Sequence, residues 1–178
     1  MRSMALALIA VSAVVGQASA PPRLDRQQVQ RVSRFYRFVI SLKNSGVPSR
    51  TVIERMSPQI STRFRNLLVQ ARTAEDRHAN EMKEPEPPLV EGSLFFSLFE
   101  GADRLGRISP EMDQGRVTCL VTLEYGDPKD PKGFARWRDR AVLIKERGRW
   151  VVDDLELLGK WPFGFKGKLS DLLREVGT

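Results

Sequence analysis

The sequence predicts an α+β domain in which N-terminal helices pack in a curved antiparallel sheet. Two observations support this fold class. In the first half of the chain, apolar residues recur at three- and four-residue steps, which is typical of amphipathic helices. In the second half, apolar and polar residues alternate, which is typical of strands with one buried face. Helices followed by a run of strands are the order expected of an α+β domain.

Residues 1–20 are predicted to be a secretory signal peptide. Arg2 is the only charged residue among them, and an uninterrupted run of 12 small and apolar residues follows it. Because a membrane-spanning helix needs about 20 apolar residues, this run is too short to remain in a bilayer, although an uncleaved N-terminal anchor is the alternative. Cleavage after Ala18 and cleavage after Ala20 both fit. The protein is therefore expected to be periplasmic or secreted, without an integral membrane segment once the signal is removed.

Residues 21–178 are predicted to form one domain, because a chain of this length is enough to bury a single core. Cys119 and His78 are the only residues of their types, which excludes an intramolecular disulfide and disfavours a metal site. We therefore expect no metal and no cofactor.

The chain is basic, with 29 Lys and Arg against 22 Asp and Glu and a net charge of +7. Loss of Arg2 with the signal would leave +6. Outside the cytoplasm such a charge favours anionic lipid or envelope polymers over nucleic acid. Because basic and acidic residues are interspersed, a solvated mixed surface is the preferred interpretation.

Capping residues and apolar periodicity together predict the N-terminal helices. They are a helix over residues 24–43 that stops near Gly46, a short helix over residues 50–56 capped by Ser49, and a long helix that begins at Ser57-Pro58 and ends at about Met82. Three prolines within residues 83–88 cannot continue a helix, so this segment is predicted to link the helical half to the strand half.

The second half is predicted to contain three strands and a closing helix. The strands are residues 116–125, 135–145 and 149–157, a loop occupies residues 126–133, and the C-terminal helix covers residues 168–176. Before them, Leu94 to Phe99 is the most apolar segment after the signal. We interpret it as a buried strand or turn of helix, the alternative being an exposed aromatic loop that inserts into a membrane or a partner.

The hairpin between the last two strands fixes which residues share a face. A two-residue turn on Arg147-Gly148 would place Arg147 at positive φ, which is uncommon for a residue with a Cβ, so a three-residue loop over residues 146–148 is predicted. It sets Lys145 opposite Arg149 and, further along, the pairs Leu143 with Val151, Ala141 with Asp153, Asp139 with Leu155, and Trp137 with Leu157.

This register places two carboxylates on one apolar face. Asp139 and Asp153 would lie diagonal to each other beside Trp137, and desolvation would suit one of them to general acid or base catalysis. The preferred alternative is a buried ion pair with arginines that reach in from the helices. With Tyr125, these three residues form the predicted ligand-binding set. By contrast, His78 is expected at the surface near a helix end, and Cys119 is expected to be an inert buried thiol.

Three motifs carry a resemblance to a known family. They are Phe35-Tyr36 in the first helix, Pro88-Leu89-Val90-Glu91-Gly92 before Leu94-Phe95, and Gly148-Arg149-Trp150-Val151-Val152-Asp153-Asp154-Leu155 at the end of the sheet. Over residues 28 to 175 the chain resembles an uncharacterised family of exported bacterial proteins in the nuclear-transport-factor-two-like, or cystatin-like, superfamily. The resemblance implies a cone, in which a bent sheet wraps around helices and encloses a pocket. Since the superfamily includes isomerases, dehydratases, hydrolases and non-catalytic binding modules, it does not choose a function.

Two functional hypotheses follow from these observations. The preferred one is an exported non-enzymatic module that binds a small ligand or a protein partner in the cell envelope, and it includes a possible homodimer through the outer sheet face. The alternative is a pocket enzyme of the isomerase or hydrolase type that uses Asp139 or Asp153 as general acid or base. No motif indicates nucleic-acid binding.

Overall fold

The computed structural model describes residues 26–43, 45–81, 88–162 and 164–178. The predicted signal and residues 83–87 of the proline-rich segment lie outside these ranges. The elements are α1 (Arg26–Leu42), α2 (Arg50–Met56), α3 (Thr62–Glu81), β1 (Arg104–Asp113), β2 (Arg116–Tyr125), β3 (Ala135–Glu146), β4 (Arg149–Leu157), β5 (Gly167–Lys168) and α4 (Leu169–Val176). The predicted α+β class is confirmed.

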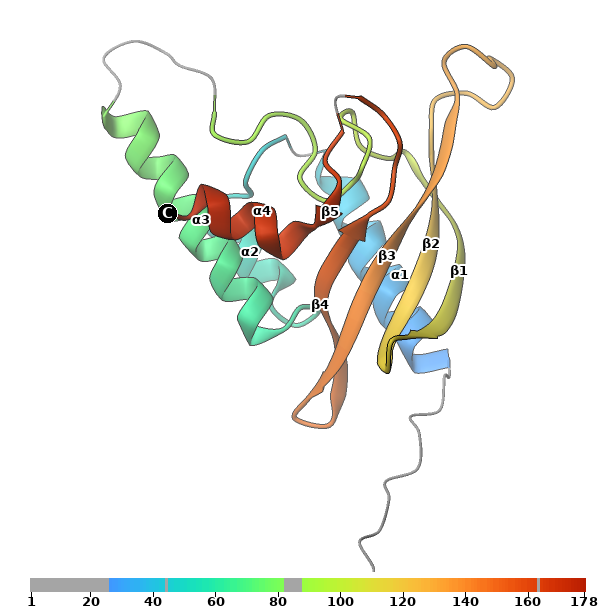
Figure 1. Cartoon of the computed structure of the whole chain (residues 1–178), viewed down its shortest axis with the longest axis horizontal. Coiled ribbons are helices and arrows are strands. Elements are labelled where there is room, and N and C mark those ends of the chain that lie inside the picture. The colour runs from blue at the N-terminus through green and yellow to red at the C-terminus, as the bar shows by residue number, and fades with distance from the viewer. Residues whose placement is uncertain (1–25, 44, 82–87, 163) are drawn as a thin grey trace, which may run out of the picture.

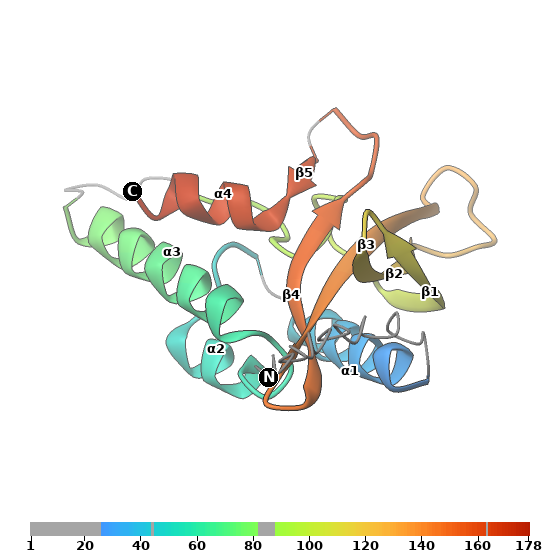
Figure 2. The ribbon, with the colours of Figure 1, turned by 60° about the horizontal axis from the view of Figure 1, so that its bottom comes forward.

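The five strands form one open antiparallel sheet in the order β1-β2-β3-β4-β5. Helix α1 packs against one face of this sheet, called here the inner face, while α2, α3 and α4 gather beyond β4 (Figure 1). Figure 2 shows α3 and α4 lying beside each other, away from β1 and β2. The main core therefore lies between α1 and the inner face.

Helix α1 covers the inner face because its apolar positions recur at helical spacing. Val32, Phe35, Tyr36 and Val39 are all buried. The Phe35 ring meets the ring of Phe95 edge-on, with 6.0 Å between centroids. Burying a side chain of this size contributes about 1.5–3 kcal/mol, so these residues fix how α1 lies on the sheet.

Strand β1 was not predicted from the sequence. It is an edge strand that contains Gly106 and Pro110, and its pairing with β2 is interrupted by an irregularity between Leu105 and Ile108. Glycine and proline are depleted in central strands but are tolerated at an edge, where one side of the strand needs no donors. The local sequence therefore does not indicate a strand. These residues form a strand because they pair with β2.

The short helix over residues 50–56 is confirmed, with Ser49 at its N-cap, but the predicted start of the long helix at Ser57 is wrong. Helix α3 begins at Thr62, and Ser61 Oγ accepts a hydrogen bond from Phe64 N at 2.9 Å. The preceding residue, Ile60, instead bridges to Val152 of β4. Because this bridge to β4 keeps the segment extended, the helix begins only at Thr62.

The predicted three-residue hairpin loop and its register are also wrong. Glu146 pairs with Arg149, so the turn contains only Arg147 and Gly148, both at positive φ. This two-residue turn matches the right-handed twist of paired strands, and the match outweighs the cost of positive φ at Arg147. As a result Leu143 pairs with Val152, not with Val151.

A bulge in β4 returns the residues that follow it to the face of the sheet that the sequence predicts. Asp153 has no partner in β3, because Val142 pairs with Asp154 and Leu143 with Val152. After the bulge, Ala141 pairs with Leu155. The hairpin and the bulge together shift the predicted pairing by two residues here, so Leu155 keeps its predicted inner position although its partner differs.

Cys119 lies in the core, as expected from its position in the alternating pattern of residues 116–125. Its side chain is fully buried, and burial together with the nearby charge of Glu111 raises the pKa of the thiol to about 12. Because the thiolate is the reactive species, we expect no reaction with a disulfide reagent such as DTNB at pH 8 in the native protein. In urea one equivalent should react. Rapid labelling without denaturant would contradict this placement.

Candidate functional site

The carboxylate of Asp139 accepts four hydrogen bonds in a fully buried position. It is fully buried on the inner face, and Oδ2 accepts hydrogen bonds from Ser97 N at 3.1 Å and from Trp137 Nε1 at 2.9 Å. The second oxygen, Oδ1, accepts from Ser97 Oγ and from Leu158 N, the latter at 2.9 Å. Four donors therefore replace the water that the carboxylate loses on burial, without a cation.

This Asp139 network joins two loops that are far apart in sequence. Ser97 belongs to the segment between α3 and β1, and Leu158 begins the segment between β4 and β5. Gly159 N also donates to Ser97 Oγ at 2.9 Å. The buried carboxylate thus holds the 94–99 segment and the 158–162 segment against each other and against β3.

Close contacts of Gly159 and Gly164 with Ser97 also hold the two loops together. A Cβ at Gly164 would lie 2.1 Å from Ser97 O, and a Cβ at Gly159 would lie 2.4 Å from the Ser97 Cβ. Only glycine allows the chain to pass so near. The Trp161 ring meets the Trp137 ring edge-on at 5.2 Å, which fixes the indole above the Asp139 network.

The two joined loops form an apolar hollow at the surface, which we call the aromatic cleft. It has a volume of about 520 Å³ and is lined by Leu98, Phe99, Glu100, Trp161, Pro162 and Gly164. The predicted burial of the 94–99 segment is confirmed for Leu94 to Leu98, but Phe99 is 44% exposed, and the nearby Leu158 is 41% exposed. Two large exposed apolar side chains beside a hollow are typical of an interaction surface.

A second hollow lies on the other side of Phe99. It has a volume of about 530 Å³ and is lined by Val39, Ile40, Lys43, Ser45, Gly92, Ser93, Phe96, Phe99, Glu100, Gly101, Ala102, Asp103 and Tyr125. We call it the Tyr125 hollow. Phe99 and Glu100 line both hollows, so the Phe99 side chain separates two neighbouring depressions at the same end of the sheet.

Asp153 has different partners and a different location from Asp139. Ser61 Oγ donates to its carboxylate, and Arg63 of α3 pairs with it at 2.8 Å. The hydrogen bond that the Arg63 guanidinium donates to Asp153 raises the pKa of Arg63 despite partial burial. The ion pair expected as the alternative to catalysis therefore exists for Asp153, and the two aspartates do not share a site.

The predicted ligand-binding set is thus divided. Trp137 and Asp139 are hydrogen-bonded to each other beneath the aromatic cleft, Tyr125 lines the neighbouring hollow, and Asp153 lines a groove beside α4. Ser97, Phe99 and Trp161 were not predicted as site residues. The apolar run at 94–99 was visible in the sequence, but nothing local showed that Trp161 would lie next to it.

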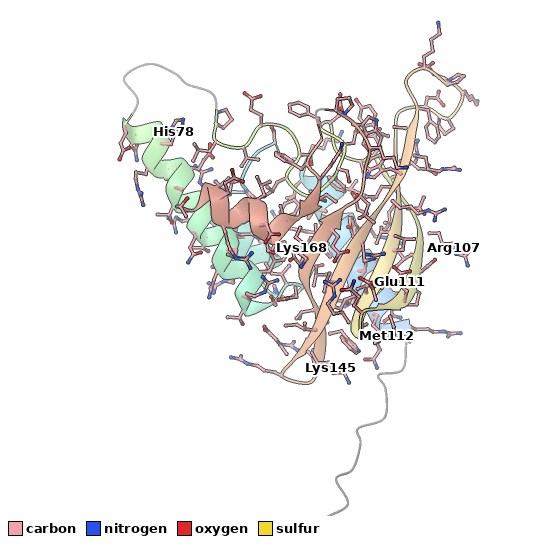
Figure 3. The ribbon with its side chains drawn as sticks, in the orientation of Figure 1. His78, Arg107, Glu111, Met112, Lys145 and Lys168 are labelled. Atoms are coloured by element: carbon pink, nitrogen blue, oxygen red, sulfur yellow. The ribbon has the colours of Figure 1, made fainter. Side chains whose placement is uncertain are left out.

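The other titratable candidates do not contribute to the cleft. His78 lies in the last turn of α3, far from β3, as Figure 3 shows. On the side of the sheet opposite α1, Arg140 pairs with Glu111, Asp113 and Glu156, and the hydrogen bond to Glu156 raises the pKa of its guanidinium. These ion pairs connect β1, β3 and β4 and form a structural network.

Two further properties of the described ranges concern metal binding and membrane spanning. No three His, Cys, Asp or Glu side chains there are grouped so that they could hold a metal ion. Nor does any described helix combine the length and apolar character needed to cross a bilayer.

Comparison with family models, with curated proteins and with solved structures gives no significant match. The function is therefore inferred from the geometry of this chain.

Proposed function

We propose that this chain is an exported, non-enzymatic binding module that takes apolar side chains of a protein partner into the aromatic cleft. The observation that carries the proposal is the cleft itself, in which exposed Phe99 and partly buried Trp161 flank an apolar hollow. Aromatic side chains that border a preformed hollow are the usual anchors of protein–protein binding.

The rigidity of the cleft supports binding with little loss of entropy. Its two loops are held by Asp139, by Ser97 and by the close approach of Gly164, so they need not become ordered when a partner arrives. A site that is already in its bound shape avoids part of the entropic cost of association.

The two hollows on either side of Phe99 favour an extended partner segment. Such a segment could place one apolar side chain in the aromatic cleft and another in the Tyr125 hollow. Among their described lining residues are the acids Glu100 and Asp103 and a single cation, Lys43, although the whole chain is basic. A partner segment with a basic residue next to its apolar side chains therefore fits best.

Export and the cystatin-like cone are parts of the same proposal. Residues 1–20 supply the reason for export, and an open antiparallel sheet that packs against α1 is consistent with the cone. The alternative, an acid–base enzyme, gains no support from the contacts. Each carboxylate oxygen of Asp139 already accepts two hydrogen bonds, and Asp153 is paired with Arg63.

The proposal can be tested by panning a random peptide-display library against the protein expressed from its full sequence. We expect enriched peptides that carry aromatic or aliphatic residues beside Lys or Arg. Their affinity for Phe99→Ser should fall by about tenfold or more, because truncating an aromatic anchor costs over 1 kcal/mol.

Met112→Ser is the matched control. Met112 is an apolar side chain of similar exposure, 42%, on the edge strand β1 (Figure 3). Peptide binding should be unchanged in this variant. Peptides that bind Phe99→Ser as tightly as the unmodified protein, or that lose binding equally in both variants, would show that the cleft is not the binding site.

A further inference from the structure

A further hollow lies on the side of the sheet opposite α1, near the loop that joins β2 to β3. It has a volume of about 460 Å³ and is lined by Gly106, Arg107, Thr122, Glu124, Arg136, Trp137 and Arg138. We call it the arginine hollow. None of these residues lines the aromatic cleft or the Tyr125 hollow, so its role is independent of the proposed function.

The irregular pairing of β1 places Arg107 on this side of the sheet. Two residues of β1, Gly106 and Arg107, stand opposite the single residue Thr122 of β2, which is the arrangement of a β-bulge. In an unbroken ladder Arg107 would instead pair with Val121, which is fully buried in the core. The bulge therefore keeps the Arg107 side chain exposed, and Figure 3 shows it at the edge of the sheet.

Small residues form the floor of the arginine hollow. Gly106 has no side chain, and a Cβ there would lie 3.2 Å from two side-chain carbons of Thr122. Thr122 pairs with Arg138 of β3, so Arg107 and Arg138 lie on either side of it. Since neighbouring strands are about 4.8 Å apart, these two arginines leave the sheet about 10 Å from each other. One guanidinium group therefore borders each side of the hollow.

Four arginines and one acid share this part of the sheet. The Glu124 carboxylate pairs with Arg104 at 3.2 Å and with Arg136 at 2.8 Å, so one negative charge is divided between two guanidinium groups. Arg107 and Arg138 are exposed, and neither forms an ion pair within the ranges that the structure describes. Four arginines against one glutamate leave an excess of three positive charges.

The other acids near the hollow do not offset this excess. Asp103 lines the Tyr125 hollow, on the α1 side of the sheet. In the loop over residues 126–133 two aspartates are matched by two lysines. The three acids that pair with Arg140 lie further along the strands, and two of them also pair with Arg116. Basic and acidic residues alternate along the sequence, but strand pairing gathers an excess of arginine here.

We propose that the arginine hollow binds a chain of at least two linked phosphate groups. A guanidinium group donates two parallel hydrogen bonds to phosphate oxygens, and Arg107 and Arg138 can do so from the two sides of the hollow. A tetrahedral phosphate presents oxygens to both sides at once, whereas a planar carboxylate faces one guanidinium group. Because one phosphate group carries at most about two negative charges, a single group would leave part of the excess charge unbalanced.

Isothermal titration with tripolyphosphate at constant ionic strength tests this proposal. We expect saturable binding by the protein expressed from its full sequence. The double variant Arg107→Gln/Arg138→Gln should bind tripolyphosphate about tenfold more weakly, because the charge-assisted contacts of both arginines are lost. Inorganic phosphate should bind the unmodified protein about tenfold more weakly than tripolyphosphate does, since it cannot reach both sides of the hollow with separate groups.

The matched control is Arg34→Gln/Arg37→Gln, which removes the same charge from exposed positions of α1, on the other side of the sheet. Tripolyphosphate binding should be unchanged in this variant. An equal loss in both double variants would overturn the proposal, because it would show attraction to net charge alone. Citrate that binds as tightly as tripolyphosphate would overturn the preference for phosphate, and inorganic phosphate that binds as tightly would overturn the requirement for linked groups.

Discussion

Replacing Asp139 with asparagine is expected to lower the free energy of unfolding by about 3–5 kcal/mol, a large share of the stability of a single domain. The carboxylate accepts four hydrogen bonds in a buried position. An asparagine of the same shape offers one acceptor oxygen, and its amide group would face N–H and O–H donors. At least two buried donors would then lack a partner.

Urea unfolding followed by tryptophan fluorescence measures this loss. Asp171→Asn is the control, since Asp171 forms an exposed pair with Arg174 and its replacement should change stability by less than about 1 kcal/mol. If the two variants unfolded at the same urea concentration, the carboxylate would not be the element that holds the two loops together.

Gly164→Ala is expected to disrupt the aromatic cleft directly. Its Cβ would lie 2.1 Å from Ser97 O, which belongs to a backbone that Asp139 already holds in place. Since neither segment can move without breaking a buried hydrogen bond, we expect a loss of about 2–3 kcal/mol and weaker binding of cleft-selected peptides.

Gly133→Ala makes the same substitution in an exposed loop. There the nearest atom to the new Cβ is Asp130 Oδ2 at 2.8 Å, the end of an exposed side chain whose rotation would cost only its hydrogen bond from Lys132 N. Its stability should change by less than about 0.5 kcal/mol, as is usual for surface positions. Equal stability of the Gly164→Ala protein and the unmodified protein would contradict the close packing of residues 97 and 164.

Local signals predicted the elements whose residues determine their own conformation. The capping serine at 49 and the alternation in residues 116–125 gave the bounds of α2 and β2 as the structure has them. Strand β1 was missed because Gly106 and Pro110 make its sequence resemble a loop. The hairpin at Arg147 was wrong because the rule against positive φ was given more weight than the twist of the paired strands.

The candidate site depends on contacts that no local pattern contains. Asp139 was noticed as a carboxylate on an apolar face, yet its partners Ser97 and Leu158 lie 42 and 19 residues away in sequence. A sequence shows that a buried acid needs partners. It does not show whether those partners are arginines, which would form an ion pair, or backbone amides, which connect two loops as they do here.

The irregular edge strand also bears on how two copies of the chain could meet. Another β-strand can extend a sheet only where an unbroken row of amides and carbonyls faces outward, and in β1 the proline at 110 and the mismatch near Gly106 interrupt that row. Continuous ribbons of molecules, the first step toward fibrils, are therefore disfavoured at this side. Any self-association at this side would have to rely on side chains.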